Sequence, residues 1–122
     1  MNNNTIVPEL ETETSNDYHS SNRIITRVAG VTFDGRQSVI ARLTLGEEIL
    51  LRREPTNPYD PNAIRVERQN GYQIGYLNRH LASTLAPFFD SNHQSVSACV
   101  NCLTGSLRPG YSLGVVITFY IP

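Results

Sequence analysis

Short runs of β-branched and long apolar side chains recur along the chain, separated by polar residues and by glycine. Five such runs occupy its first two thirds, at residues 27–33, 39–45, 48–53, 63–68 and 72–77. Turn signals separate the first three runs at Asp34-Gly35 and Gly46-Glu47, and Asn70-Gly71 between the last two favours a two-residue hairpin turn. The pattern predicts a three-stranded meander followed by a β-hairpin.

The last third of the chain predicts a helix and then two strands. Asn78 can cap a helix that begins at Arg79, where apolar residues recur at helical spacing over residues 81–86. Pro87 should break or kink this helix. Residues 96–103 and 113–121 are rich in β-forming side chains and flank a loop with glycine and proline. We therefore predict a mainly β fold, a small β-barrel of six or seven strands with one or two short helices.

Residues 1–22 differ from the rest in composition. They are rich in Asn, Ser, Thr and Glu and hold too few apolar side chains for a packed face, which predicts a disordered tail. The charged residues of this tail are all acidic: Glu9, Glu11, Glu13 and Asp17. Residues 23–122 hold ten arginines against seven acidic residues, so a mildly basic domain follows the acidic tail, although the whole chain has a net charge of −1.

The ten basic residues are all arginines, and the chain has no lysine. A guanidinium group pairs bidentately with phosphate and stacks on bases, so this choice suits a nucleic-acid partner. A bias in genome composition would produce the same preference for arginine over lysine. The composition alone leaves both explanations open.

Length and termini narrow the class of protein. A chain of 122 residues is long enough for one domain with a single core. No apolar stretch approaches the roughly 20 residues of a membrane span, and residues 1–4 lack the basic start and apolar run of a signal peptide. We expect no membrane partner and a cytoplasmic, intracellular protein.

The sequence lacks the motifs of common catalytic and metal sites. It has no nucleophile elbow, no glycine-rich phosphate loop and no carboxylate pairs for two metals, so we expect neither an enzyme nor a cofactor. Cys99 and Cys102 have the spacing of half a zinc site, which His80 and His93 would have to complete. Strand alternation should direct the two thiols to opposite faces, so we expect free, at least half-buried cysteines and no metal.

The most distinctive segment lies between residues 53 and 64. It places Pro55, Pro58 and Pro61 among polar residues, together with Tyr59 and Asp60. Proline fixes φ at about −65° and restricts the residue before it, so much of the freedom that a loop loses on binding is already removed. We interpret the segment as a preorganised binding loop.

This loop and its surroundings resemble a known family. The motifs are, in chain order, Val28-Ala29-Gly30, Leu50-Leu51-Arg52-Arg53, Asn57-Pro58-Tyr59-Asp60-Pro61-Asn62-Ala63-Ile64, Gly71-Tyr72-Gln73-Ile74-Gly75-Tyr76-Leu77 and Ala82. In this combination the chain resembles the HIRAN domain family from about residue 27 onwards, and we assign residues 23–122 to such a domain. The resemblance implies a modified, OB-like β-barrel with helical insertions.

The resemblance also implies that the domain captures the 3′ end of single-stranded DNA, and it suggests roles for individual residues. Asp60 would accept a hydrogen bond from the terminal hydroxyl, Tyr59 would stack on a base and Asn57 would add a polar contact. Phe33 and Tyr111 would be further aromatic residues beside the site. Structural alternatives stay open: an Asx turn for Asp60, a core position for Phe33 and a plug in the barrel rim for Tyr111.

Two positions depart from the family pattern. Thr32 stands where a family member has an arginine, and Tyr76 stands where it has a histidine. Binding of the terminal phosphate should be weaker unless another arginine substitutes, and Arg79 at a helix N-terminus is our first candidate. Further candidates, some of which should only pair with Glu48, Glu54 or Glu67, are Arg52, Arg53, Arg65 and Arg68.

We therefore expect a binding module for single-stranded DNA or a DNA 3′ end with a free hydroxyl, linked to DNA repair or replication-fork processing. A helicase or another repair protein would be its protein partner. Two other functions stay open. One is a protein-interaction module that docks its partner on the proline-rich loop, and the other is a metal-dependent hydrolase of nucleic acid or phosphoanhydride, using Asp60, His80 and Glu54.

Overall fold

Six strands and two helices make up the part of the chain that the computed structural model describes, residues 22–92, 95–106 and 108–121. In chain order they are β1 (Arg23–Arg27), α1 (Arg36–Ile40), β2 (Glu48–Arg53), β3 (Ile64–Arg68), β4 (Gln73–Tyr76), α2 (Arg79–Asn92), β5 (Ser95–Gly105) and β6 (Leu113–Tyr120). The predicted mainly β composition is confirmed.

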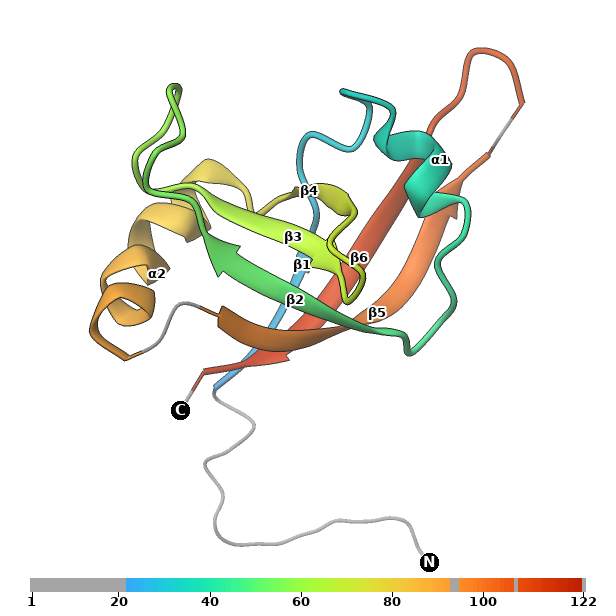
Figure 1. Cartoon of the computed structure of the whole chain (residues 1–122). Helices are drawn as coiled ribbons and strands as arrows, with labels where there is room; N and C mark the ends of the chain where they lie inside the picture. Colours follow the sequence, from blue (N-terminus) through green and yellow to red (C-terminus); the bar gives the residue numbers. More distant parts are fainter. Residues whose placement is uncertain (1–21, 93–94, 107, 122) are drawn as a thin grey trace, which may run out of the picture.

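The strands form one antiparallel sheet, in the order β1-β6-β5-β2-β3-β4, that curls on itself (Figure 1). The chain just after β1 reaches the opposite edge, where the amides of Ala29 and Tyr76 donate to each other's carbonyl oxygens at 2.8 and 2.9 Å. Gly75 permits this approach, because a Cβ at that position would collide with the Ala29 carbonyl oxygen. The sheet is the small OB-like barrel that the sequence predicts.

Aliphatic side chains and two phenylalanines fill the inside of the curled sheet. Phe89 of α2 and Phe119 of β6 are the largest fully buried side chains. The helix α2 packs near β2, and the short α1 packs against β4 and β6, so that the two helices lie at different ends of the sheet in Figure 1. Each helix contributes to one common core.

Residues 27–45 do not form the two strands that the apolar runs predict. The first strand lies earlier, at β1, and α1 occupies the start of the second run. Three residues between them have positive φ: Gly30 (70°), Asp34 (56°) and Gly35 (75°). This left-handed backbone turns the chain sharply, which an apolar run does not reveal. Ile40 and Leu43 are both buried and lie three residues apart, which is a helical spacing. We interpreted this part of the sequence as a strand.

The helix α2 begins as predicted but does not end at Pro87. The Asn78 side chain caps it, because Oδ1 accepts the Leu81 amide at 2.8 Å. Pro87 lies inside the helix on its exposed side, and Leu85, Ala86 and Phe89 around it are buried. Burial of these apolar side chains offsets the one backbone hydrogen bond that proline removes.

The prediction that Cys99 and Cys102 face opposite sides is wrong. Cys99 pairs with Thr118 and Cys102 with Val116, because the register shifts between Val100 and Cys102. A bulge of this kind inserts one residue and restores the same facing, so both free thiols are exposed rather than half-buried. Within the described ranges no group of three or more metal-binding side chains comes together.

The predicted disordered tail, residues 1–22, lies outside the described residues except for Asn22. Among the described helices, none is both long and apolar enough to cross a membrane.

Candidate functional site

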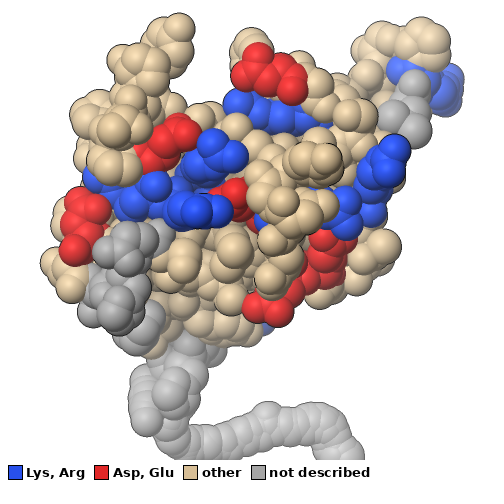
Figure 2. Space-filling model, in the orientation of Figure 1, with Lys and Arg blue, Asp and Glu red and all other residues tan. Residues whose placement is uncertain are grey.

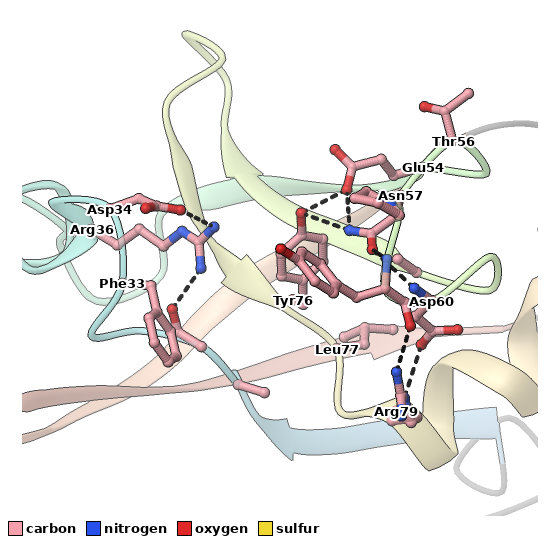
Figure 3. A pocket seen from close by; sticks show the side chains of 15 residues that line it. Phe33, Asp34, Arg36, Glu54, Thr56, Asn57, Asp60, Tyr76, Leu77 and Arg79 are labelled. Atoms are coloured by element: carbon pink, nitrogen blue, oxygen red, sulfur yellow. Dashed lines mark hydrogen bonds and ion pairs between the residues drawn. The ribbon is translucent and has the colours of Figure 1, made fainter.

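A pocket of about 710 Å³ opens between the proline-rich loop and the loop that joins β1 to α1. Six of the side chains singled out in the sequence contribute to its lining: Phe33, Asn57, Tyr59, Asp60, Tyr76 and Arg79. The remaining lining residues are Ala29, Gly30, Asp34, Arg36, Glu54, Thr56, Pro58, Ala63 and Leu77. We call this space the end pocket; Figure 3 shows it from close by.

Asn57 organises the proline-rich loop from within. Its Oδ1 accepts the backbone amides of Tyr59 and Asp60 at 2.8 and 3.0 Å. Its Nδ2 donates to Glu54 Oε1 at 2.8 Å and to the Tyr76 hydroxyl at 3.2 Å (Figure 3). Both polar atoms of its side chain are therefore engaged within the protein. In this geometry Asn57 shapes the loop, and a direct polar contact to a ligand would require it to give up one of these bonds.

Glu54 is the polar centre of the same wall. Its Oε1 accepts the Tyr76 hydroxyl at 2.6 Å as well as Asn57, and its Oε2 pairs with Arg65 at 3.2 Å. Burial alone would raise the pKa of Glu54, but the hydrogen bonds from Tyr76, Asn57 and Arg65 together outweigh burial and lower this pKa below its ordinary value of 4.5. Glu54 is therefore an anion at neutral pH, although it lines the pocket.

Asp60 lies at the edge of this loop with one oxygen committed to the fold. Its Oδ1 accepts the Asn62 amide at 2.9 Å, which is the Asx turn that we considered from the sequence. Its Oδ2 lies 3.5 Å from Arg79 Nε. The Arg79 guanidinium also donates to the Tyr59 carbonyl at 2.7 Å and is largely exposed. The Asx turn leaves Asp60 Oδ2 as the oxygen with free acceptor capacity beside the pocket.

Two aromatic side chains of the pocket are exposed to solvent. Tyr59 is 85% exposed and Phe33 is 64% exposed, so neither is a core residue, and the core alternative for Phe33 is excluded. The backbone of Tyr59 is held on both sides, by Asn57 at its amide and by Arg79 at its carbonyl. A flat, solvent-facing ring on a backbone that is held in place is a surface on which a nucleic-acid base stacks.

The facing wall is built around Arg36, which the sequence reading missed. Its side chain is only 9% exposed. Its guanidinium donates to the Gly30 carbonyl at 2.7 Å, to Asp34 at 3.3 Å and to Gln73 at 3.3 Å, and it lies 5.3 Å from the centre of the Tyr76 ring. Its Nε has no partner in the described part of the chain. Arg36 thus brings a positive charge into the pocket from α1.

Thr32 and Tyr111 do not line the end pocket. Thr32 is exposed on the loop beside Phe33. Tyr111 lies in the β5–β6 connection, 65% exposed, with the Arg108 guanidinium 5.5 Å from its ring centre. The structure therefore brings together six of the eight predicted site residues.

Four of the other eight arginines pair with acidic side chains in the described part of the chain, as the sequence suggested for some of them. The pairs are Arg52 with Glu67, Arg53 with Asp90, Arg65 with Glu54 and Arg68 with Glu47. Figure 2 shows basic and acidic atoms interspersed over the face of β2 and β3 rather than a single basic patch. The end pocket itself holds three acids, Asp34, Glu54 and Asp60, and two arginines, Arg36 and Arg79. The lining side chains alone therefore sum to −1, and Arg65, which pairs with Glu54, brings the sum to zero.

Comparisons with known proteins agree with this architecture. The family model described as HIRAN domain matches residues 21–122. The helicase-like transcription factors of Oryctolagus cuniculus and Homo sapiens are 46% and 43% identical to this chain over 54 residues. These matches cover 44% of this chain but only 5% of those proteins. The Fanconi-associated nuclease 1 homolog of Oryza sativa is 42% identical over 59 residues, 45% of this chain and 6% of that protein.

Solved structures give the same result at the level of the fold. The crystal structure of the HIRAN domain of human HLTF has a TM-score of 0.59 and 28% identity, with 81% of this chain and 75% of that chain covered. A protein from Lactobacillus plantarum superposes with a TM-score of 0.60 at 23% identity, over 80% of this chain and 92% of that chain, which supports the fold alone. Because the family model spans nearly all of the described residues and the barrel matches, this chain belongs to the HIRAN domain family.

Proposed function

We propose that the protein is a DNA-binding module that captures the 3′ end of a single strand through the terminal hydroxyl. The observation that carries the proposal is the placement of the Asp60 carboxylate beside the exposed Tyr59 ring in one preorganised pocket. A carboxylate only accepts hydrogen bonds, and a terminal sugar hydroxyl is a donor that an internal phosphodiester lacks. The ring stacks on a base without regard to its identity.

Two carboxylates of the end pocket support selection for a hydroxyl rather than a phosphate end. Asp60 and Glu54 are both acidic and line the same space, and the hydrogen bonds that lower the pKa of Glu54 keep it ionised. A terminal phosphate would bring up to two further negative charges against them. A neutral hydroxyl meets no such repulsion and satisfies the free acceptor capacity of Asp60.

The proposal is tested by titrating the protein into one fluorescently labelled single strand with three kinds of terminus. One strand carries a free 3′ hydroxyl, one carries a 3′ phosphate and one is circularised. We expect the hydroxyl end to bind most tightly and the circle to bind most weakly, with affinity that falls as salt rises. Equal affinity for all three strands would show that the pocket does not read an end.

The biological setting follows from the same proposal. A module that holds a 3′ end would serve proteins that act where a nascent strand terminates, such as those of DNA repair or fork processing. A helicase or another repair protein is the partner that we propose for it. Co-purification tests this partner. The helicase or repair protein should be recovered only when this chain is the bait, and it should still be recovered after nuclease treatment.

A further inference from the structure

A second, smaller groove lies at the other end of α1 from the end pocket. It has a volume of about 300 Å³ and is lined by Ser38, Val39, Arg42, Arg68, Asn70 and Tyr72. Tyr72 is 65% exposed at the β3–β4 turn. The Arg42 side chain is exposed and forms no ion pair with any described residue. The groove therefore combines an open aromatic ring with an unpaired guanidinium, the two groups that bind single-stranded nucleic acid.

Within the described ranges, the groove holds an unpaired positive charge that the end pocket lacks. Arg42 and Arg68 line it, and the acidic partner beside them is Glu47, which pairs with Arg68 at 2.7 Å. One positive charge is left over, whereas the end pocket has none left when Arg65, the partner of Glu54, is counted in the same way. A strand that places an uncharged hydroxyl in the end pocket has its phosphates elsewhere. The groove offers those phosphates a guanidinium group without an acidic partner among the described residues, which the pocket does not.

Two elements, α1 and β4, connect the groove to the end pocket. Arg36 at the start of α1 lines the pocket, and Val39 near its end lines the groove. The strand β4 carries Tyr76 in the pocket, and Tyr72 directly precedes this strand. Ile74 has no register partner on β3, so a bulge turns Gln73 and Tyr76 to one side, where Arg36 contacts both. Four residues of extended chain span about 13 Å. About four nucleotides cover that distance even at the stacked spacing of roughly 3.4 Å per nucleotide.

The alternative route, across β2 and β3, offers less to a phosphate. Arg52 and Arg65 lie directly opposite each other there. Both contact Glu67, which is 2% exposed, and Arg65 also pairs with Glu54. These guanidinium groups are already neutralised by carboxylates within the fold. The unpaired Arg42 has no such partner among the described residues.

We infer that a single strand held at its 3′ end in the end pocket continues along α1 and β4 into the groove, where Tyr72 stacks on an upstream base and Arg42 binds an upstream phosphate. This inference rests on the proposed function for the direction of the strand. It makes the protein a reader of the strand over several nucleotides, not of the terminal nucleotides alone. In this arrangement the end pocket selects the 3′ end, and the groove adds affinity through the charge of Arg42.

The test compares a dinucleotide with an oligothymidylate of about twelve nucleotides, both with free 3′ hydroxyls, by isothermal titration calorimetry. The variants are Tyr72→Ala and Arg42→Ala. Tyr72→Phe retains the ring, and Arg23→Ala removes one exposed arginine of β1 that lines neither site and has no ion pair in the described chain. Thermal unfolding checks that every variant is folded, which we expect because all three positions are exposed.

We expect Tyr72→Ala to lower the affinity for the long strand at least about fivefold, because one stacked base is lost. Tyr72→Phe should leave this affinity unchanged. Arg42→Ala should reduce the slope of log affinity against log salt by about 0.7, and Arg23→Ala should not. Neither Tyr72→Ala nor Arg42→Ala should affect the dinucleotide.

Each contrary outcome has a distinct meaning. If the wild-type protein binds the dinucleotide and the long strand equally, or if Arg42→Ala matches Arg23→Ala, the inference is overturned while end capture stands. A second outcome uses long strands with a 3′ phosphate or a 3′ hydroxyl. If the wild-type protein binds the two strands equally, and Tyr72→Ala and Arg42→Ala weaken the binding of both to the same extent, the groove binds a strand but end selection fails. If no strand binds, both ideas fail.

Discussion

Asp60 gives the sharpest separation between a folding role and a binding role, because its two oxygens have different partners. Oδ1 accepts the Asn62 amide at 2.9 Å, and Oδ2 lies 3.5 Å from an Arg79 that is 73% exposed. Asp60→Ala removes the acceptor of the Asx turn, which should lower the free energy of unfolding by about 0.5–1.5 kcal/mol. Asp60→Asn keeps a carbonyl acceptor in that place and loses only the exposed pair, a change of at most about 1 kcal/mol.

The effect of Asp60→Asn on binding should exceed its effect on the fold. A hydrogen bond to a charged group contributes about 1.5–3 kcal/mol and a neutral one about 0.5–1.5 kcal/mol, so the hydroxyl end should bind roughly five- to tenfold more weakly. A 3′ phosphate end should bind as well as before or better, because one like charge is gone. Fluorescence anisotropy with both ends and urea unfolding of both variants measure the two quantities. The idea is refuted if Asp60→Asn weakens both ends equally.

The other predictions concern affinity, the tail and acid stability. Tyr59→Ala should weaken every single strand by about 1–3 kcal/mol, whatever its end, since it removes a stacking surface; anisotropy that changes for one kind of end only would contradict this. Thr32→Arg adds a charge beside Phe33 and should tighten binding and steepen the salt slope by about 0.7; unchanged binding by a folded variant would mean that position 32 does not face the strand. Deletion of residues 1–22 removes four acidic residues and should raise DNA affinity slightly without unfolding the domain, as circular dichroism can check. Because the pKa of Glu54 is lowered in the fold, its contribution to stability is present above pH 4.5 and is lost as pH falls below that value; the decline in urea stability should be shallower in Glu54→Gln, and identical slopes would count against the network.

The sequence predicted the later elements more closely than the earlier ones. The strand β2 has the predicted bounds, and α2 begins after the Asn78 cap. The β3–β4 hairpin forms where we predicted it, but not with a two-residue turn. The Arg68 amide donates to the Tyr72 carbonyl, so residues 69–71 form a three-residue loop in which Gly71 has a φ of 93°. Each of these rests on local chemistry: an apolar run, a turn residue and a capping side chain. The ordered proline-rich loop could also be predicted from local chemistry, because proline and asparagine restrict the backbone next to them.

Residues 27–45 were misread because their structure depends on contacts far along the chain. The side chain of Gln37 donates to the Leu113 carbonyl at 3.0 Å and accepts the Leu113 amide at 2.7 Å, which fixes α1 to β6. Arg36 is buried for a similar reason, since its partners include Gln73. A charged residue after Asp34-Gly35 reads as solvent-exposed from sequence alone. The signal available was the Asp34-Gly35 turn itself, which we placed between two strands rather than before a helix.

Tyr76 explains how both walls of the end pocket are held in one arrangement. Its hydroxyl donates to Glu54 at 2.6 Å and accepts from Asn57 at 3.2 Å on one wall, and its ring faces the Arg36 guanidinium at 5.3 Å on the other. A histidine ring is shorter than a phenol, so with the same backbone it would not extend as far toward Glu54 while facing Arg36. The length of the tyrosine side chain at position 76 therefore suits contact with Glu54 and Arg36 at the same time. Arg36, whose side chain is buried, brings a guanidinium group to this second wall. Tyr76 and Arg36 thus hold the two walls of the end pocket together.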